Sequence, residues 1–97
     1  MFIVTLTFSE NKSLAPEYMA EHNSWIQKGV EEGVFLIVGG LATGDGGLIV
    51  AHNQTVEELN ERISNDPFVR EKVVIADVTE FKPGKTDSRL NFLLADS

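Results

Sequence analysis

The order of the apolar segments along the chain constrains the fold more than any other feature of the sequence. Four short segments have the β-branched, aromatic or alternating character of strands, and two longer ones repeat apolar residues at the spacing of a helix face. Strands are predicted at residues 2–8, 34–38, 48–51 and 73–81, and helices at about residues 16–33 and 55–65. With 97 residues, 42% of them apolar, one domain is expected.

The ends of both helices carry recognisable signals. Pro16 suits a first helical turn, and Gly33 suits the left-handed residue that follows a helix. Thr55 and Glu58 have the spacing of a capping box, in which each side chain accepts a backbone N–H of the other residue. Pro67 restricts the residue before it, so the second helix is expected to close at residues 65–67.

The resulting order, strand–helix–strand–strand–helix–strand, is that of the ferredoxin-like α+β fold. We expect a four-stranded antiparallel sheet with both helices on one face. The other face is rich in apolar residues, so we expect a second copy of the chain to cover it. The two middle strands are predicted to form a hairpin, joined by about nine glycine-rich residues at 39–47.

Charge and composition exclude several classes of function. Eight basic against fifteen acidic residues give a net charge of −7, which argues against nucleic acid or an anionic membrane as a partner. The chain has no cysteine, so thiolate chemistry and disulfides are impossible. The apolar segment 1–8 lacks basic residues and is too short for a signal peptide or a membrane span. A cytoplasmic protein without a cofactor is expected.

The chain divides at its last predicted strand into a folded domain, residues 1–83, and a tail, residues 84–97. The tail is polar except for one apolar cluster: Leu90, Phe92, Leu93 and Leu94. Because such a cluster rarely stays in water, we expect the tail to dock on a partner subunit.

His22 is the most informative candidate for chemistry. It lies within the apolar stripe of the first helix, near Tyr18 and Trp25, and is therefore predicted to point inward. It is either a structural histidine satisfied by one internal hydrogen bond, or an imidazole that lines a half-buried pocket and is usable near neutral pH.

Asp66 is the second candidate, and it also has two interpretations. It could cap the turn that follows the second helix by accepting N–H groups. Because the middle of the first helix and the end of the second pack on the same sheet face, Asp66 could also accept a ring N–H from His22 and fix its tautomer.

The remaining candidates are weaker. His52 follows the third strand, and a surface position is expected. Two histidines thirty residues apart, without a cysteine, make a poor metal site. The glycine-rich segment at 39–47 matches neither a Walker loop nor a dinucleotide fingerprint, so it forms either tight turns or a pocket rim that offers backbone N–H groups.

Taken together, these motifs resemble the YciI-like family over about residues 2–83. The resemblance rests on Glu21-His22-Asn23-Ser24-Trp25-Ile26, Gly33, Leu36, Gly39-Gly40, Gly46-Gly47, Asn65-Asp66-Pro67-Phe68 and Glu80-Phe81. It implies a homodimer of the dimeric α/β barrel type with a pocket that contains a His22–Asp66 pair. One difference is Gly40-Leu41, where many members have Gly-Pro after the second strand.

Two functions follow as hypotheses. In the first, the protein is a lyase, isomerase or hydrolase acting on a small molecule, and the dehydrochlorinase among the relatives implies an aromatic one. His22 moves a proton and Asp66 orients it. Trp25, Gly39, Gly40 and Phe68 are the expected pocket residues. In the second, it is a non-catalytic dimeric protein that binds a small ligand or has an accessory role.

Overall fold

The computed structural model describes residues 1–96 and confirms the predicted βαββαβ order. The six expected elements are β1 (Phe2–Phe8), α1 (Ala15–Glu31), β2 (Phe35–Gly40), β3 (Gly46–Ala51), α2 (Val56–Ser64) and β4 (Val74–Glu80). Three short helices were not predicted: η1 (Lys12–Leu14), α3 (Pro67–Arg70) and η2 (Ser88–Asp96).

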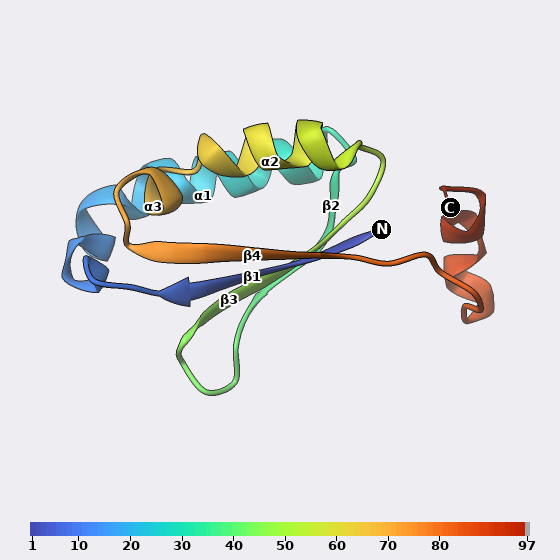
Figure 1. Cartoon of the computed structure of the whole chain (residues 1–97), viewed down its shortest axis with the longest axis horizontal. Coiled ribbons are helices and arrows are strands. Elements are labelled where there is room, and N and C mark those ends of the chain that lie inside the picture. The colour runs from blue at the N-terminus through green and yellow to red at the C-terminus, as the bar shows by residue number, and fades with distance from the viewer. Residues whose placement is uncertain (97) are drawn as a thin grey trace.

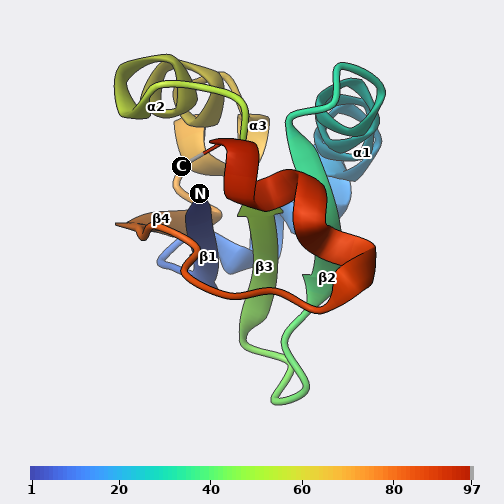
Figure 2. The same ribbon diagram turned by 90° about the vertical axis from the view of Figure 1, so that its right-hand side faces the viewer.

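The four strands form one antiparallel sheet in the order β2-β3-β1-β4. Figure 1 shows α1, α2 and α3 together on one side of this sheet. In the view of Figure 2 the strands follow one another as β4, β1, β3 and β2 beneath the helices. This is the ferredoxin-like arrangement that the segment order predicts.

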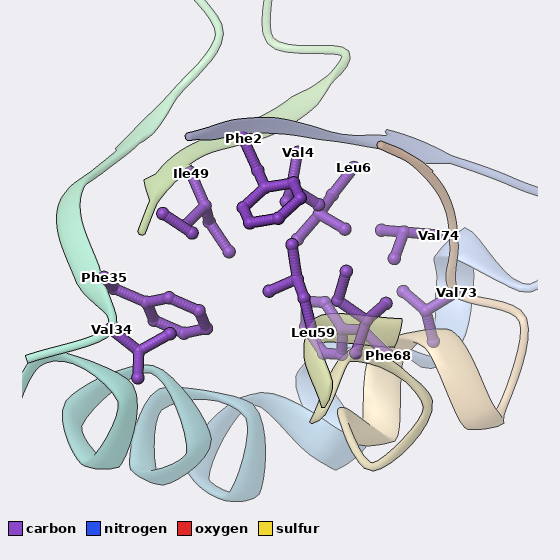
Figure 3. Close-up of a cluster of buried hydrophobic side chains, with 12 residues drawn as sticks. Phe2, Val4, Leu6, Val34, Phe35, Ile49, Leu59, Phe68, Val73 and Val74 are labelled. Carbon is purple, nitrogen blue, oxygen red and sulfur yellow. The ribbon is translucent and has the colours of Figure 1, made fainter. Parts of the chain in front are cut away.

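The hydrophobic core fills the space between the sheet and the helices, as Figure 3 shows. One residue in two of β1 points into it, since side chains alternate along a strand. The core consists of Phe2, Val4, Leu6, Val34, Phe35, Ile49, Ala51, Leu59, Ile63, Phe68, Val73 and Val74.

The predicted helix signals are present. Gly33 follows α1 with a φ of 75°, a conformation that glycine adopts at little cost. Thr55 accepts the backbone N–H of Glu58, whose side chain accepts the N–H of Thr55 in return. α2 ends at Ser64, and Asp66 does not simply close it but caps the additional helix α3.

The connection between β2 and β3 is shorter than predicted. It comprises residues 41–45, because the flanking glycines belong to the strands: Gly39 pairs with Leu48, and Gly40 pairs with Gly47. Glycine has little preference for strands by itself, so its pairing partner decides this boundary.

The prediction for His52 was wrong. This residue is buried, with 8% of its surface exposed, and its backbone N–H donates to the carbonyl of Val34. Its ring meets that of Phe92 edge to face, with 6.2 Å between the ring centroids. The tail therefore returns to the domain and covers a position that the local sequence places at the surface.

The helix of the tail, η2, lies next to the ends of the strands. Figure 1 shows η2 beyond the ends of the strands, on the side where the N-terminus lies. Leu93 is buried, whereas Leu90, Phe92 and Leu94 remain exposed. Within residues 1–96, no helix has the length and apolar character needed to cross a membrane.

Candidate active site

His22 is held on the inner face of α1 by two aromatic rings. Only 8% of its surface is exposed. The ring stacks on that of Phe68, with 3.9 Å between centroids and 4° between planes, and Trp25 lies 5.9 Å away on the same helix. The helical spacing of His22 and Trp25 places both on one face, so packing fixes the plane of the imidazole.

Asp66 is the hydrogen-bond partner of that imidazole, as the sequence analysis anticipated. Its Oδ1 lies 2.7 Å from Nδ1 of His22, and the carboxylate is fully buried. The same oxygen accepts the backbone N–H of Phe68 at 3.0 Å and so caps α3. Both interpretations of Asp66 therefore hold at once: it is a helix cap and a histidine partner.

This double acceptor role assigns the tautomer of His22. Because Oδ1 already acts as an acceptor for Phe68, the ring proton in the contact with His22 belongs on Nδ1. Nε2 has no hydrogen-bond partner among residues 1–96, which leaves it available as a proton acceptor. The other oxygen, Oδ2 of Asp66, is buried and also lacks a partner in the described part of the chain.

A cavity of about 240 Å³ opens beside His22, between α1 and the hairpin end of the sheet. Its lining is mostly apolar, and the polar side chains in it belong to His22 and Asn23. The residues that form its walls are Leu6, Phe8, Met19, His22, Asn23, Ile26, Val38, Gly39, Gly40, Gly46, Gly47, Leu48, Ile49, Phe68 and Val74.

The expected pocket residues divide into two groups. Gly39, Gly40 and Phe68 line the cavity together with His22. Trp25 does not; it lies behind His22, where its indole N–H donates to the carbonyl of Arg62 at 3.0 Å. The tryptophan thus links α1 to α2, and its ring lies next to the imidazole.

Sequence reasoning missed the residues of α1 that complete the wall. Met19, Asn23 and Ile26 stand four and three residues apart, and His22 lies between them. This is the spacing of neighbours on one helix face, so a helical projection centred on His22 would have identified them. Leu6 and Phe8 would likewise follow from the alternation of β1.

The titratable groups whose pKa is shifted, such as Glu32 and Tyr18, do not line the cavity. The Arg62 guanidinium donates to Oε1 of Glu32 at 2.6 Å and lowers the pKa of that carboxyl group. The charge of Glu71, followed by burial, raises the pKa of the Tyr18 hydroxyl. Residues 1–96 contain no group of three or more acidic, histidine or cysteine side chains arranged to hold a metal ion.

Comparisons with known proteins agree with this architecture. Residues 1–82 match the family described as the YCII-related domain. The fold is similar to that of 5-chloro-2-hydroxyhydroquinone dehydrochlorinase from Burkholderia phenoliruptrix AC1100, solved in a complex with 2,5-dihydroxybenzoquinone. That match has a TM-score of 0.66 and 17% identity, and it covers 87% of this chain and 96% of the other. The search of curated proteins gave no match.

Proposed function

The chain belongs to the family of YCII-related domains, and on this premise we propose that it is an enzyme that uses His22 and Asp66 for general acid–base chemistry on a small organic molecule. The observation that carries the proposal is the placement of one imidazole between a buried carboxylate and a cavity. A histidine that served packing alone would not need an open space beside it.

The proposed roles follow from the two ring nitrogens. Nε2 accepts a proton from the substrate, and the resulting imidazolium is stabilised by Asp66 through Nδ1–H. In a lyase, the electrons of the broken bond then expel a leaving group; in an isomerase, the proton returns to another atom of the same molecule. In a hydrolase, His22 would take its proton from water.

A lyase reaction gives the most direct test. The structurally similar enzyme is named as a dehydrochlorinase of 5-chloro-2-hydroxyhydroquinone. Loss of HCl from such a compound requires a base that removes a hydroxyl proton, while chloride departs with the electrons of the C–Cl bond. We therefore propose this compound as a first substrate, with chloride release as the measured quantity.

The test compares the native chain with His22→Gln, which keeps a polar group without the basic nitrogen. We expect chloride release to fall by about 10²- to 10⁴-fold, the usual contribution of a positioned general base. Glu10→Gln, an exposed surface change, is the control. Equal rates in the native and His22→Gln proteins would rule out His22 as the base.

A second candidate is a non-catalytic module that binds a small ligand. The tight stacking of His22 on Phe68 favours it, because a ring fixed in this way also serves as a packing element. Under this alternative, the native chain would bind 2,5-dihydroxybenzoquinone in the cavity and release no chloride from the chlorinated compound.

We also propose that the protein acts as a homodimer. Ile37 and Ile75 are 62% and 63% exposed on the sheet face opposite the helices. A second copy of the same face would bury both, and the exposed Leu90 and Phe92 of the tail would dock on that partner.

A further inference from the structure

We infer that the cavity owes its size to Gly40 and Gly47, and that Gly40 in particular limits which molecules can enter. This inference deepens the proposed function, because it concerns the same cavity and so rests on that proposal for its biological meaning. The size limit itself is a property of binding and is measurable without turnover.

The register of the sheet shows why these two positions matter. Paired residues of neighbouring strands point to the same face. Gly47 pairs with Leu6 of β1, which is a core residue, and Gly40 pairs with Gly47. Both glycines therefore occupy positions that face the helices.

The adjacent row of the sheet shows what these positions would otherwise hold. There, Val4 pairs with Ile49, which pairs with Val38, and all three side chains pack in or against the core. One row further along, Leu6 is followed by two positions without side chains. The missing volume lies opposite Met19 and Asn23 of α1, where the cavity is found.

The backbone does not demand glycine at position 40. Gly46 has a φ of 150°, and a Cβ there would overlap the carbonyl oxygen of Leu6. A Cβ on Gly47 would lie 3.2 Å from the carbonyl oxygen of Gly39, closer than ordinary contact. At Gly40 the nearest atom would be 3.9 Å away and φ is not positive. A Cβ would fit the strand there, so the backbone leaves this glycine unexplained, whereas the cavity explains it.

The walls indicate the chemical class that the space accepts. An apolar protein cavity of about 150 Å³ is large enough to bind benzene, and this one has about 240 Å³. Its polar side chains, from His22 and Asn23, are neighbours on α1. The cavity thus suits a compact, mainly apolar molecule of about one substituted ring, with a polar group directed at those two side chains.

The experiment measures the binding of phenol, 4-ethylphenol and 4-propylphenol by NMR, following the amide signals of Asn23. The variants are Gly40→Ala and Gly40→Val, which add side chains toward the cavity, and Met19→Ala, which shortens the opposite wall. Gly84→Ala is the matched control, since a Cβ there meets nothing within 4 Å and Gly84 does not line the cavity.

We expect Gly40→Val to weaken binding of 4-propylphenol by about 10- to 200-fold, the range for one misplaced methylene in an apolar pocket. Phenol should lose less, Gly40→Ala should show a smaller loss in the same direction, and Met19→Ala should shift the preference toward the longer probes. Gly84→Ala should bind as the native chain does.

Unchanged affinities in a folded Gly40→Val protein would overturn the inference. If that variant does not fold, unchanged affinities in Gly40→Ala would do so, as would a native chain that binds none of the three phenols. The two experiments can fail separately. If Gly40→Val weakens binding of 4-propylphenol but His22→Gln does not change turnover, only the acid–base role is ruled out. If His22→Gln lowers turnover but Gly40→Val does not change binding, only the role of Gly40 is ruled out.

Discussion

At the scale of single residues, Asp66 is the position where fold and site depend on the same atom. Its Oδ1 accepts both the ring N–H of His22 and the backbone N–H that begins α3. A side chain that satisfies two buried donors is costly to remove, because each donor loses its partner in a place that water does not reach.

We therefore predict that Asp66→Ala destabilises the protein by roughly 2–4 kcal/mol, which combines the loss of a helix cap with an unpaired buried ring N–H. Urea denaturation measures the change. Asp66→Asn, which keeps an acceptor oxygen for Phe68, should cost less. A loss below about 0.5 kcal/mol for the alanine variant would mean that neither hydrogen bond contributes to stability as described.

The tautomer of His22 provides an independent test of its hydrogen bond to Asp66. In the native protein, ¹⁵N chemical shifts of the neutral ring should report a proton on Nδ1 and none on Nε2. In Asp66→Ala this preference should weaken, because no carboxylate remains to hold the proton on Nδ1. A native ring with the proton on Nε2 would contradict the arrangement on which the proposed base depends.

At the scale of elements, the contact between α1 and β2 depends on a glycine within a helix. Gly29 is buried, and a Cβ built on it would overlap the ring of Phe35, which is only 3% exposed. Trp25 packs against the same ring, with 5.1 Å between centroids, so Phe35 has little room to move. The glycine lets the helix approach the sheet closely enough to place His22.

Gly29→Ala should consequently destabilise the protein, although alanine favours helices by about 1 kcal/mol over glycine. Overpacking of this kind costs about 1–3 kcal/mol. We expect a net loss in the free energy of unfolding, measured by urea denaturation, and no comparable loss in Gly84→Ala. A stabilised Gly29→Ala protein would show that the helix and the ring separate without cost.

Most of the helices and strands could be predicted from the sequence, because their signals are local. The apolar stripe of α1, the capping box at Thr55 and the alternation of β1 depend only on neighbours in the chain. The strand character of Gly39 and Gly46 and the burial of His52 depend on segments that are distant in sequence. Such contacts leave no local pattern, so those features were missed.

The candidate site was only partly predictable for the same reason. Helical spacing places His22 inward, and the topology brings Asp66 toward it. The cavity, however, lies where β2 and β3 have no side chains facing α1. This happens because the strand register pairs Gly40 with Gly47. Register is set by the whole sheet and by turn geometry, not by either glycine.

At the scale of the whole molecule, the sheet is covered on one side only. The helices bury one face, and the opposite face exposes Ile37 and Ile75. Two-layer folds bury their apolar faces against another layer, and the second copy in the proposed homodimer would supply that layer.

Ile37→Lys should therefore weaken the proposed dimerisation by at least about 100-fold, since burial of an isoleucine contributes about 1.5–3 kcal/mol and each dimer would contain two copies. Sedimentation equilibrium measures the change. Val30→Lys is the matched control, because Val30 is 45% exposed on α1, on the helical side of the molecule. Equal dissociation constants for both variants would place the interface elsewhere.

Because Asp66 both caps α3 and binds His22, its retention has an evolutionary consequence. Selection for a folded chain is enough to retain this aspartate, so a lineage that abandoned the chemistry would keep it nonetheless. His22 takes part in only one of these two hydrogen bonds, so its replacement would leave the cap of α3 in place and should cost less stability than the loss of Asp66. Under the proposed function, the histidine is therefore the residue whose retention would mark an active enzyme.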